Sequence, residues 1–148
     1  MLASIRPDSV NLPLFVHVFG AMVLVGGLLV TSTATFVAQG DTRVLRIGYK
    51  TLLVICLPGY IVMRVGAEWT YARERLGDGG SDPAWIAIGY ITADLGALLL
   101  LIALFLGGIG IRRARNGPAG LLQASLVLSV VLLAAYVVTI WAMGAKPI

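Results

Sequence analysis

Residues 96–110 read GALLLLIALFLGGIG, a stretch without a single charged side chain. It belongs to a longer apolar run, at about residues 84–111, in which Asp94 is the only formally charged side chain. A helix needs about 20 mostly apolar residues to span a bilayer, and this run is long enough. Backbone groups in lipid must be hydrogen-bonded within the protein, so the run is predicted to form a helix rather than a strand.

Three further runs of this kind account for most of the remaining chain. They lie at about residues 12–38, 47–68 and 119–143, and the second has a more polar helical extension to about residue 76. Hydrophobic residues make up 59% of the sequence and charged residues 12%, about half the charged share of a soluble domain. The 148 residues are therefore predicted to form one all-α integral membrane domain, an antiparallel four-helix bundle with short loops.

The basic residues gather in two predicted turns on one side of this bundle. Arg43 and Arg46 lie in the turn at 39–47, and three further arginines lie in the turn at 112–118. Basic loops favour the cytoplasmic side, so we expect a multi-pass protein of a bacterial inner (plasma) membrane with both termini outside. Because these charges lie beside apolar runs, the partner expected for them is the lipid bilayer and not nucleic acid.

Two prolines bear on the course of the helices. Pro13 is expected in the first turn of the first helix, where its missing N–H would be unpaired in any case. Pro58 lies inside the second run and is expected to kink that helix.

Three of the apolar runs each carry one ionisable side chain, namely His17, Arg64 and Asp94. A charged Arg or Asp near the centre of a spanning helix costs about 2.5–3.5 kcal/mol, so such groups are expected to be paired or to face a cavity. At a rise of 1.5 Å per residue, they lie about 8, 6 and 15 Å from the outer ends of their helices. We predict an Arg64–Asp94 ion pair, with Glu68 one helical turn beyond Arg64. His17 is expected either to bond to that pair or to face a small outward-opening cavity, which completes an intramembrane polar cluster.

Helical periodicity predicts which faces point into the bundle. Small and polar residues recur every three or four positions on the first helix, and a mildly polar face does so on the fourth. Small residues let helices approach closely and hydroxyls bond between them, so both faces are predicted to point inward. They consist of His17, Gly20, Leu24, Gly27, Thr31 and Thr35 on the first helix, and of Ser125, Ser129, Leu132, Tyr136, Thr139 and Met143 on the fourth.

The segment LFVHVFGAMVLVGGLLV, residues 14–30, contains a histidine early in the first helix, followed by small residues and a Gly-Gly pair. In this pattern of His17, Gly20, Gly26 and Gly27, the segment resembles the first helix of a group of small bacterial membrane proteins. The group includes the copper-resistance D-type proteins, the membrane protoporphyrinogen-oxidase family and related uncharacterised membrane families. The segments PGYIVMRVGAEWTY and PAWIAIGYITADLG also resemble parts of such uncharacterised proteins.

For the oxidase family, the resemblance implies haem b bound through the histidine of the first helix, which is His17 in this sequence. The sequence has no second histidine, so the second axial ligand would have to be a methionine, with Met63 as a candidate, and Arg64 could then hold a propionate. These three are the candidate cofactor-binding residues. Copper resistance needs clusters of Met, His and Cys for Cu(I), and four methionines with one histidine and one cysteine are few for that.

The sequence contains no catalytic motif that we can identify. It has no HExxH motif, no Gly-Lys-Ser phosphate loop and no GxSxG elbow. Cys56 is the only cysteine, which excludes an intrachain disulfide and a multi-cysteine metal site. We therefore predict no catalytic and no metal-ligating residue, and an enzymatic activity is not favoured.

Three kinds of function remain open on the sequence. The favoured one is a non-enzymatic accessory, scaffold or self-assembling membrane subunit, which forms a homo-oligomer or joins a larger membrane complex. The alternative is a haem-binding or redox membrane protein that uses His17 as axial ligand. The third is a small transporter or proton relay that uses Asp94 and Arg64.

Overall fold

The computed structural model describes residues 8–74, 84–115 and 117–144, and every regular element within them is a helix. The elements are α1 (Asp8–Val37), α2 (Thr42–Thr51), the π-helical turn η1 (Leu52–Cys56), α3 (Leu57–Glu74), α4 (Ala84–Arg113) and α5 (Gly120–Gly144). Because α2, η1 and α3 follow one another without a break, the described residues form four helical rods. Each rod is long and apolar enough to cross a membrane.

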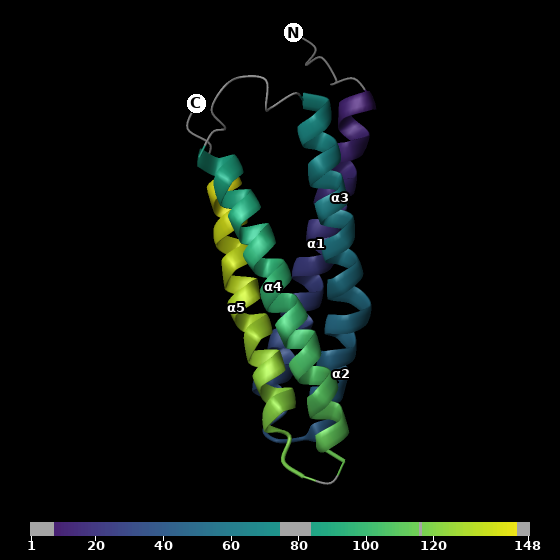
Figure 1. Ribbon diagram of the computed structural model, residues 1–148, viewed down its shortest axis with the longest axis vertical. Helices are drawn as coiled ribbons and strands as arrows, with labels where there is room; N and C mark the ends of the chain where they lie inside the picture. Colours follow the sequence, from purple (N-terminus) through teal and green to yellow (C-terminus); the bar gives the residue numbers. More distant parts are fainter. Residues whose placement is uncertain (1–7, 75–83, 116, 145–148) are drawn as a thin grey trace.

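The four rods run along the long axis of the molecule (Figure 1). The start of α1, the end of α3, the start of α4 and the end of α5 lie at one end, which we call the terminal end. The turns from α1 to α2 and from α4 to α5 lie at the opposite end (Figure 1). We call this the basic end, because Arg43, Arg46, Arg112 and Arg113 lie beside these turns.

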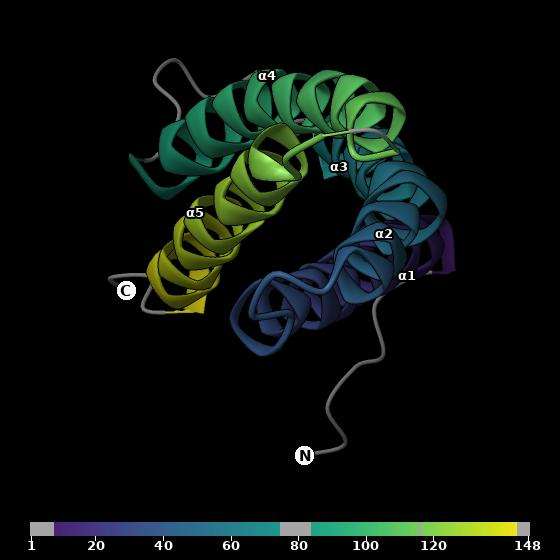
Figure 2. The same ribbon diagram turned by 90° about the horizontal axis from the view of Figure 1, so that it is seen from below.

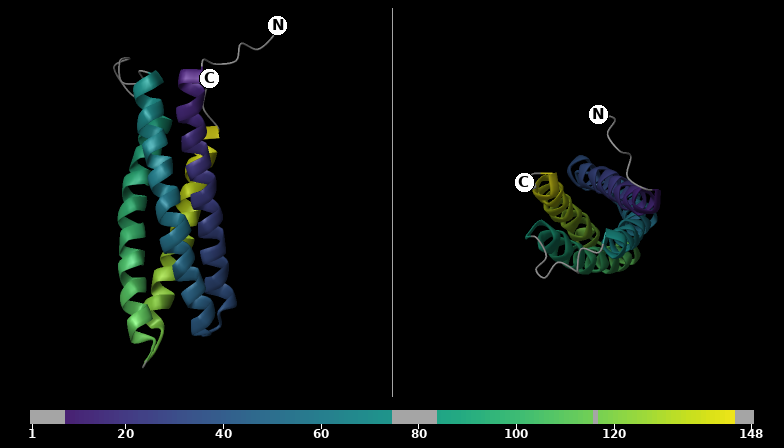
Figure 3. Two further views of the ribbon diagram at one scale, coloured as in Figure 1. Left: turned by 90° about the vertical axis from the view of Figure 1, so that its right-hand side faces the viewer. Right: turned by 90° about the horizontal axis from the view of Figure 1, so that it is seen from above.

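The rods form two tightly packed pairs. α1 packs on α3 and α4 packs on α5 along much of their length, whereas α3 and α4 barely touch. Contacts of α1 and α2 with α5 join the pairs, and the pairs diverge toward the terminal end (Figures 1 and 3). Seen along the axis, the four rods follow an open arc (Figure 2). The fold thus leaves room between the pairs at the terminal end.

Glycines let α1 and α3 approach each other backbone to backbone. Gly20 lies against the backbone of Met63, and Gly66 lies against the backbone of His17, so closely that a methyl group on either glycine would overlap main-chain atoms. The predicted inward faces are confirmed at most of their positions. The buried members are Gly20, Leu24, Gly27, Thr31, Ser125, Ser129, Leu132, Tyr136 and Thr139.

The second rod begins at Thr42, earlier than the predicted start near residue 47. The chain reverses at Gly40, which has a φ of 92°. The side chain of Asp41 then accepts a hydrogen bond of 2.7 Å from the backbone N–H of Arg43. This N-cap starts the helix at once, so Arg43 and Arg46 lie in α2 and the prediction that they lie in a loop is wrong.

The helix changes its hydrogen-bonding pattern just before Pro58. Proline has no N–H to donate, and its ring collides with the carbonyl of the preceding turn of a regular helix. The turn η1 is wide, and the backbone N–H of Leu57 bonds to the carbonyl of Leu52, so the predicted disturbance takes the form of a π-helical turn. Pro13 lies inside α1, because this helix already begins at Asp8. Pro13 is also buried. The prediction that Pro13 opens this helix is wrong.

The other helix ends lie close to their predicted positions. α1 ends at Val37, α4 extends to Arg113, and α5 covers Gly120–Gly144. α3 continues as one helix to Glu74, so the predicted extension is part of the same rod. Residues 75–76 of that extension lie outside the described residues.

Candidate functional site

A cavity of about 770 Å³ lies between the two helix pairs, in the half of the molecule nearer the terminal end. All four rods contribute to its wall, which is mostly aliphatic and includes Trp85. The other polar and charged residues of the wall are His17, Arg64, Thr70, Tyr71, Tyr90, Tyr136 and Thr139. A concave, mainly apolar site of roughly 300–1,000 Å³ with a few polar groups is typical of a small-molecule binding site.

The cavity is long and opens on one side. Its wall on α1 runs from Leu14 to Leu29, about 22 Å at a rise of 1.5 Å per residue. Val18, Met22 and Ile140 line the cavity and are also exposed at the molecular surface. The opening therefore lies between α1 and α5, and it is bordered by apolar side chains.

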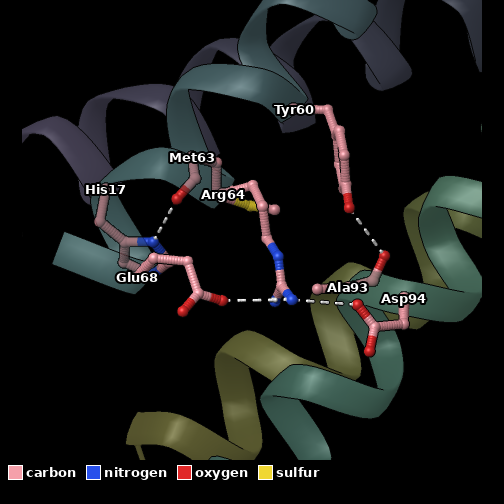
Figure 4. Close-up of polar contacts among 7 residues, drawn as sticks. All are labelled: His17, Tyr60, Met63, Arg64, Glu68, Ala93 and Asp94. Carbon is pink, nitrogen blue, oxygen red and sulfur yellow. Dashed lines mark hydrogen bonds and ion pairs between the residues drawn. The ribbon is translucent and has the colours of Figure 1, made fainter. Parts of the chain in front are cut away.

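Arg64 of α3 joins the two helix pairs on the opposite side of the cavity (Figure 4). Its Nη2 lies 3.2 Å from Oε1 of Glu68 and 3.2 Å from Oδ1 of Asp94, so the predicted Arg64–Asp94 ion pair is present. The guanidinium also lies over the ring of Tyr90, 4.8 Å from its centroid. One positive and two negative charges give these three side chains a formal net charge of −1.

The two carboxylates lie on the outer surface of the molecule and not in the cavity. The side chains of Asp94 and Glu68 are 66% and 52% exposed, whereas that of Arg64 is 28% exposed. Arg64 lines the cavity, and neither acid does. The predicted cluster is therefore divided, with the cation in the cavity wall and the acids behind it.

Two further contacts hold α3 against α4. The hydroxyl of Tyr60 donates a hydrogen bond of 3.2 Å to the carbonyl of Ala93 (Figure 4). The ring of Tyr71 packs edge-on against the ring of Tyr90, with centroids 5.8 Å apart. Because the two helices barely touch elsewhere, these side chains and Arg64 make up most of the junction.

His17 is bonded to the neighbouring helix. Its Nδ1 lies 2.9 Å from the carbonyl oxygen of Met63 (Figure 4). A carbonyl oxygen only accepts, so Nδ1 carries a proton, and Nε2 is an acceptor in the neutral ring. His17 and Met63 both line the cavity. Of the two environments that the sequence left open for His17, the structure shows the cavity.

His17, Arg64 and Asp94 lie at similar distances along their own helices. Counted from the described ends of α1, α3 and α4 at the terminal end, they lie about 14, 15 and 15 Å along their helices. The depths predicted from the sequence were counted from residues 12 and 68, whereas α1 begins at Asp8 and α3 continues through the predicted extension to Glu74.

Tyr136 of α5 was not predicted as a site residue. It lines the cavity and is 6% exposed, and its buried hydroxyl has no hydrogen-bond partner within the described ranges. The hydroxyl lies against Gly96, where any side chain would collide with it. Helical spacing placed Tyr136 on an inward face, but only the packing shows that its hydroxyl is unpartnered. A native fold rarely leaves such a group without a reason.

The described residues include no group of three or more His, Cys, Asp or Glu side chains placed to hold a metal ion. Cys56 is buried, and its Sγ lies 4.0 Å from the carbonyl of Leu24, which is a packing contact. The polar chemistry on offer in the cavity therefore comes from single side chains, above all His17 and Arg64.

Comparison of the chain with protein-family models, with curated proteins and with solved structures finds no significant match.

Proposed function

We propose that this chain is a non-enzymatic, multi-pass protein of a bacterial inner membrane that binds a lipid-like molecule in the cavity between its helix pairs. It would cross the membrane as an antiparallel four-helix bundle, with the basic end in the cytoplasm and both termini outside. A reporter enzyme fused after the last residue, active only outside the cytoplasm, tests this orientation. The single observation that carries the proposal is the apolar cavity, to which all four rods contribute.

The length of the cavity fits a hydrocarbon chain. Its wall on α1 extends about 22 Å, whereas one leaflet contributes about 15 Å to the roughly 30 Å hydrocarbon core of a bilayer. A hydrocarbon chain that moves from the bilayer into the cavity would exchange lipid neighbours for protein side chains. Because both surroundings are apolar, the cost in free energy is small. The exposed rim of Val18, Met22 and Ile140 would let such a chain enter sideways from the bilayer.

Occupying part of the cavity with a side chain should weaken binding. Gly26 lines the cavity, and a Cβ atom built on it meets no atom within 4 Å, so Gly26→Leu adds a bulky group at the cavity wall where the helix has room for its Cβ. Trp85 in the wall reports binding when Trp69 and Trp141 are replaced by Phe, because brominated acyl chains quench tryptophan on contact. With a brominated monoacylglycerol in detergent, we expect saturable quenching in the parent protein and at least about tenfold weaker binding in Gly26→Leu, a loss of about 1.4 kcal/mol or more.

The matched control is Gly120→Leu. A Cβ atom on Gly120 also meets nothing within 4 Å, and Gly120 does not line the cavity. This variant should bind the probe as the parent protein does. Equal affinity in Gly26→Leu and Gly120→Leu would show that the probe binds elsewhere, and the proposal would fail.

A second candidate function, haem binding, is favoured by one observation. Nδ1 of His17 donates to the carbonyl of Met63, which is the outer hydrogen bond that iron-ligating histidines usually make, and this leaves Nε2 for the metal. Met63 lines the same cavity and would supply the second ligand of a His/Met pair. Arg64 fits the role of a propionate partner poorly, because Glu68 and Asp94 already share its charge. Bound haem would supply redox chemistry.

An absorption spectrum decides this second candidate. Protein purified from haem-replete cells should show a Soret band, with α and β bands after reduction by dithionite, and His17→Ala should lose them. A colourless protein from such cells would exclude haem as the resident ligand and would leave the lipid proposal untouched.

A further inference from the structure

We infer that the cavity selects a lipid with an uncharged, hydroxyl-bearing head, whose O–H donates to Nε2 of His17. The inference rests on the proposed function and specifies its ligand. Three features of the cavity wall support it, namely its charge, the tautomer of His17 and the level at which the polar groups lie.

The charge of the site disfavours an anionic head. Arg64 is the only cationic side chain in the wall, and it already shares its charge with Glu68 and Asp94 at 3.2 Å each. A carboxylate or phosphate in the cavity would meet a guanidinium whose charge is already balanced by two carboxylates behind it. The guanidinium is held in place by its two acids and by the Tyr90 ring, so it is not free to turn fully toward an incoming anion.

The tautomer of His17 sets the direction of the hydrogen bond. The carbonyl of Met63 takes the Nδ1 proton, so Nε2 of the neutral ring can only accept. An alcohol can donate to this nitrogen, whereas an ether, a ketone or a carboxylate cannot. Tyr136 lines the same wall, but its hydroxyl is buried against Gly96, so the acceptor offered to the head is Nε2 of His17.

The polar groups lie well inside the molecule. His17 and Arg64 lie about 14 and 15 Å from the described helix ends at the terminal end. The head would lie between the helix pairs among mainly apolar side chains, which suits an uncharged group better than the zwitterionic or anionic head of a phospholipid.

Competition against the brominated monoacylglycerol tests the inference with three ligands that share one chain. They are hexadecanol, its methyl ether and hexadecanoate, measured at pH 8, above the usual titration range of imidazole. We expect hexadecanol to displace the probe at about tenfold lower concentration than the ether, because a tenfold ratio of affinities corresponds to about one hydrogen bond. Hexadecanoate should be the weakest competitor of the three. His17→Leu should retain binding of the chain and lose the preference for the alcohol.

Each outcome bears on one claim. If the ether or the carboxylate competes as well as the alcohol, or if His17→Leu keeps the preference, the inference about the head is wrong while binding of the chain stands. If the brominated probe itself does not bind saturably, the proposed function fails as well. Because the panel is measured first on the parent protein, it does not depend on the folding of the variant.

Discussion

Gly66→Ala should be among the most destabilising small substitutions in this protein. Its added methyl group would overlap the backbone of His17, and backbone atoms cannot move aside as the end of a flexible side chain can. α1 and α3 would have to separate along their main contact, so we expect a loss of about 3 kcal/mol in the free energy of unfolding. Titration of the bicelle-reconstituted protein with a denaturing detergent, followed by circular dichroism, measures this loss.

Gly26→Ala is the matched control. It makes the same substitution in a helix, but its methyl group meets no atom within 4 Å. The better helix propensity of alanine should leave stability unchanged or raise it by up to about 1 kcal/mol. Equal stabilities of Gly66→Ala and Gly26→Ala would contradict the close backbone packing of α1 on α3.

Arg64→Met should also lower the free energy of unfolding by a large amount. Glu68 and Asp94 would lose their shared cation, and each carboxylate would then have to be protonated or remain charged beside lipid. The cost of a charge in a spanning helix is about 2.5–3.5 kcal/mol. Because both acids are more than half exposed, we expect a total loss of about 2–3 kcal/mol in bicelles, rather than the sum of two full penalties. The same detergent titration measures it.

Removing the two acids together with Arg64 provides the control. The triple variant Arg64→Met, Glu68→Gln, Asp94→Asn carries no charge in this cluster, and it should recover most of the stability lost in Arg64→Met. If Arg64→Met lies within about 0.5 kcal/mol of the parent protein, the ion pairs are of the kind found at an aqueous surface, and the level assigned to them within the membrane is wrong.

The sequence predicts the four rods because each apolar run is long enough to be recognised as a membrane-spanning helix without knowledge of the tertiary structure. It also predicts the Arg64–Asp94 pair, since two opposite charges in apolar helices have few other ways to remain ionised. The start of the second rod was misplaced, because the N-cap of Asp41 on Arg43 overrides the polar composition of residues 42–46. That error is local, since it depends on one turn.

The sequence raised a cavity as one possible environment of His17, but the size and the walls of the cavity could not be predicted. The cavity exists because the helix pairs diverge, and the divergence depends on contacts between residues far apart in the chain, such as Gly66 with His17 and Tyr60 with Ala93. Helical spacing places Tyr136 on an inward face, but whether its hydroxyl finds a partner depends on where α4 lies. For the same reason, the sequence could not show that Asp94 faces outward while Arg64 faces the cavity.

The central claim is that a lipid-like molecule occupies the cavity, and the mass of the intact protein tests it most directly. The protein is released from mild detergent micelles in the mass spectrometer, with Gly26→Leu and Gly120→Leu prepared in parallel. We expect one copurified amphiphile per chain in the parent protein and in Gly120→Leu, and a smaller bound fraction in Gly26→Leu. A parent protein that is free of any ligand, or a ligand retained equally in Gly26→Leu, would contradict the account.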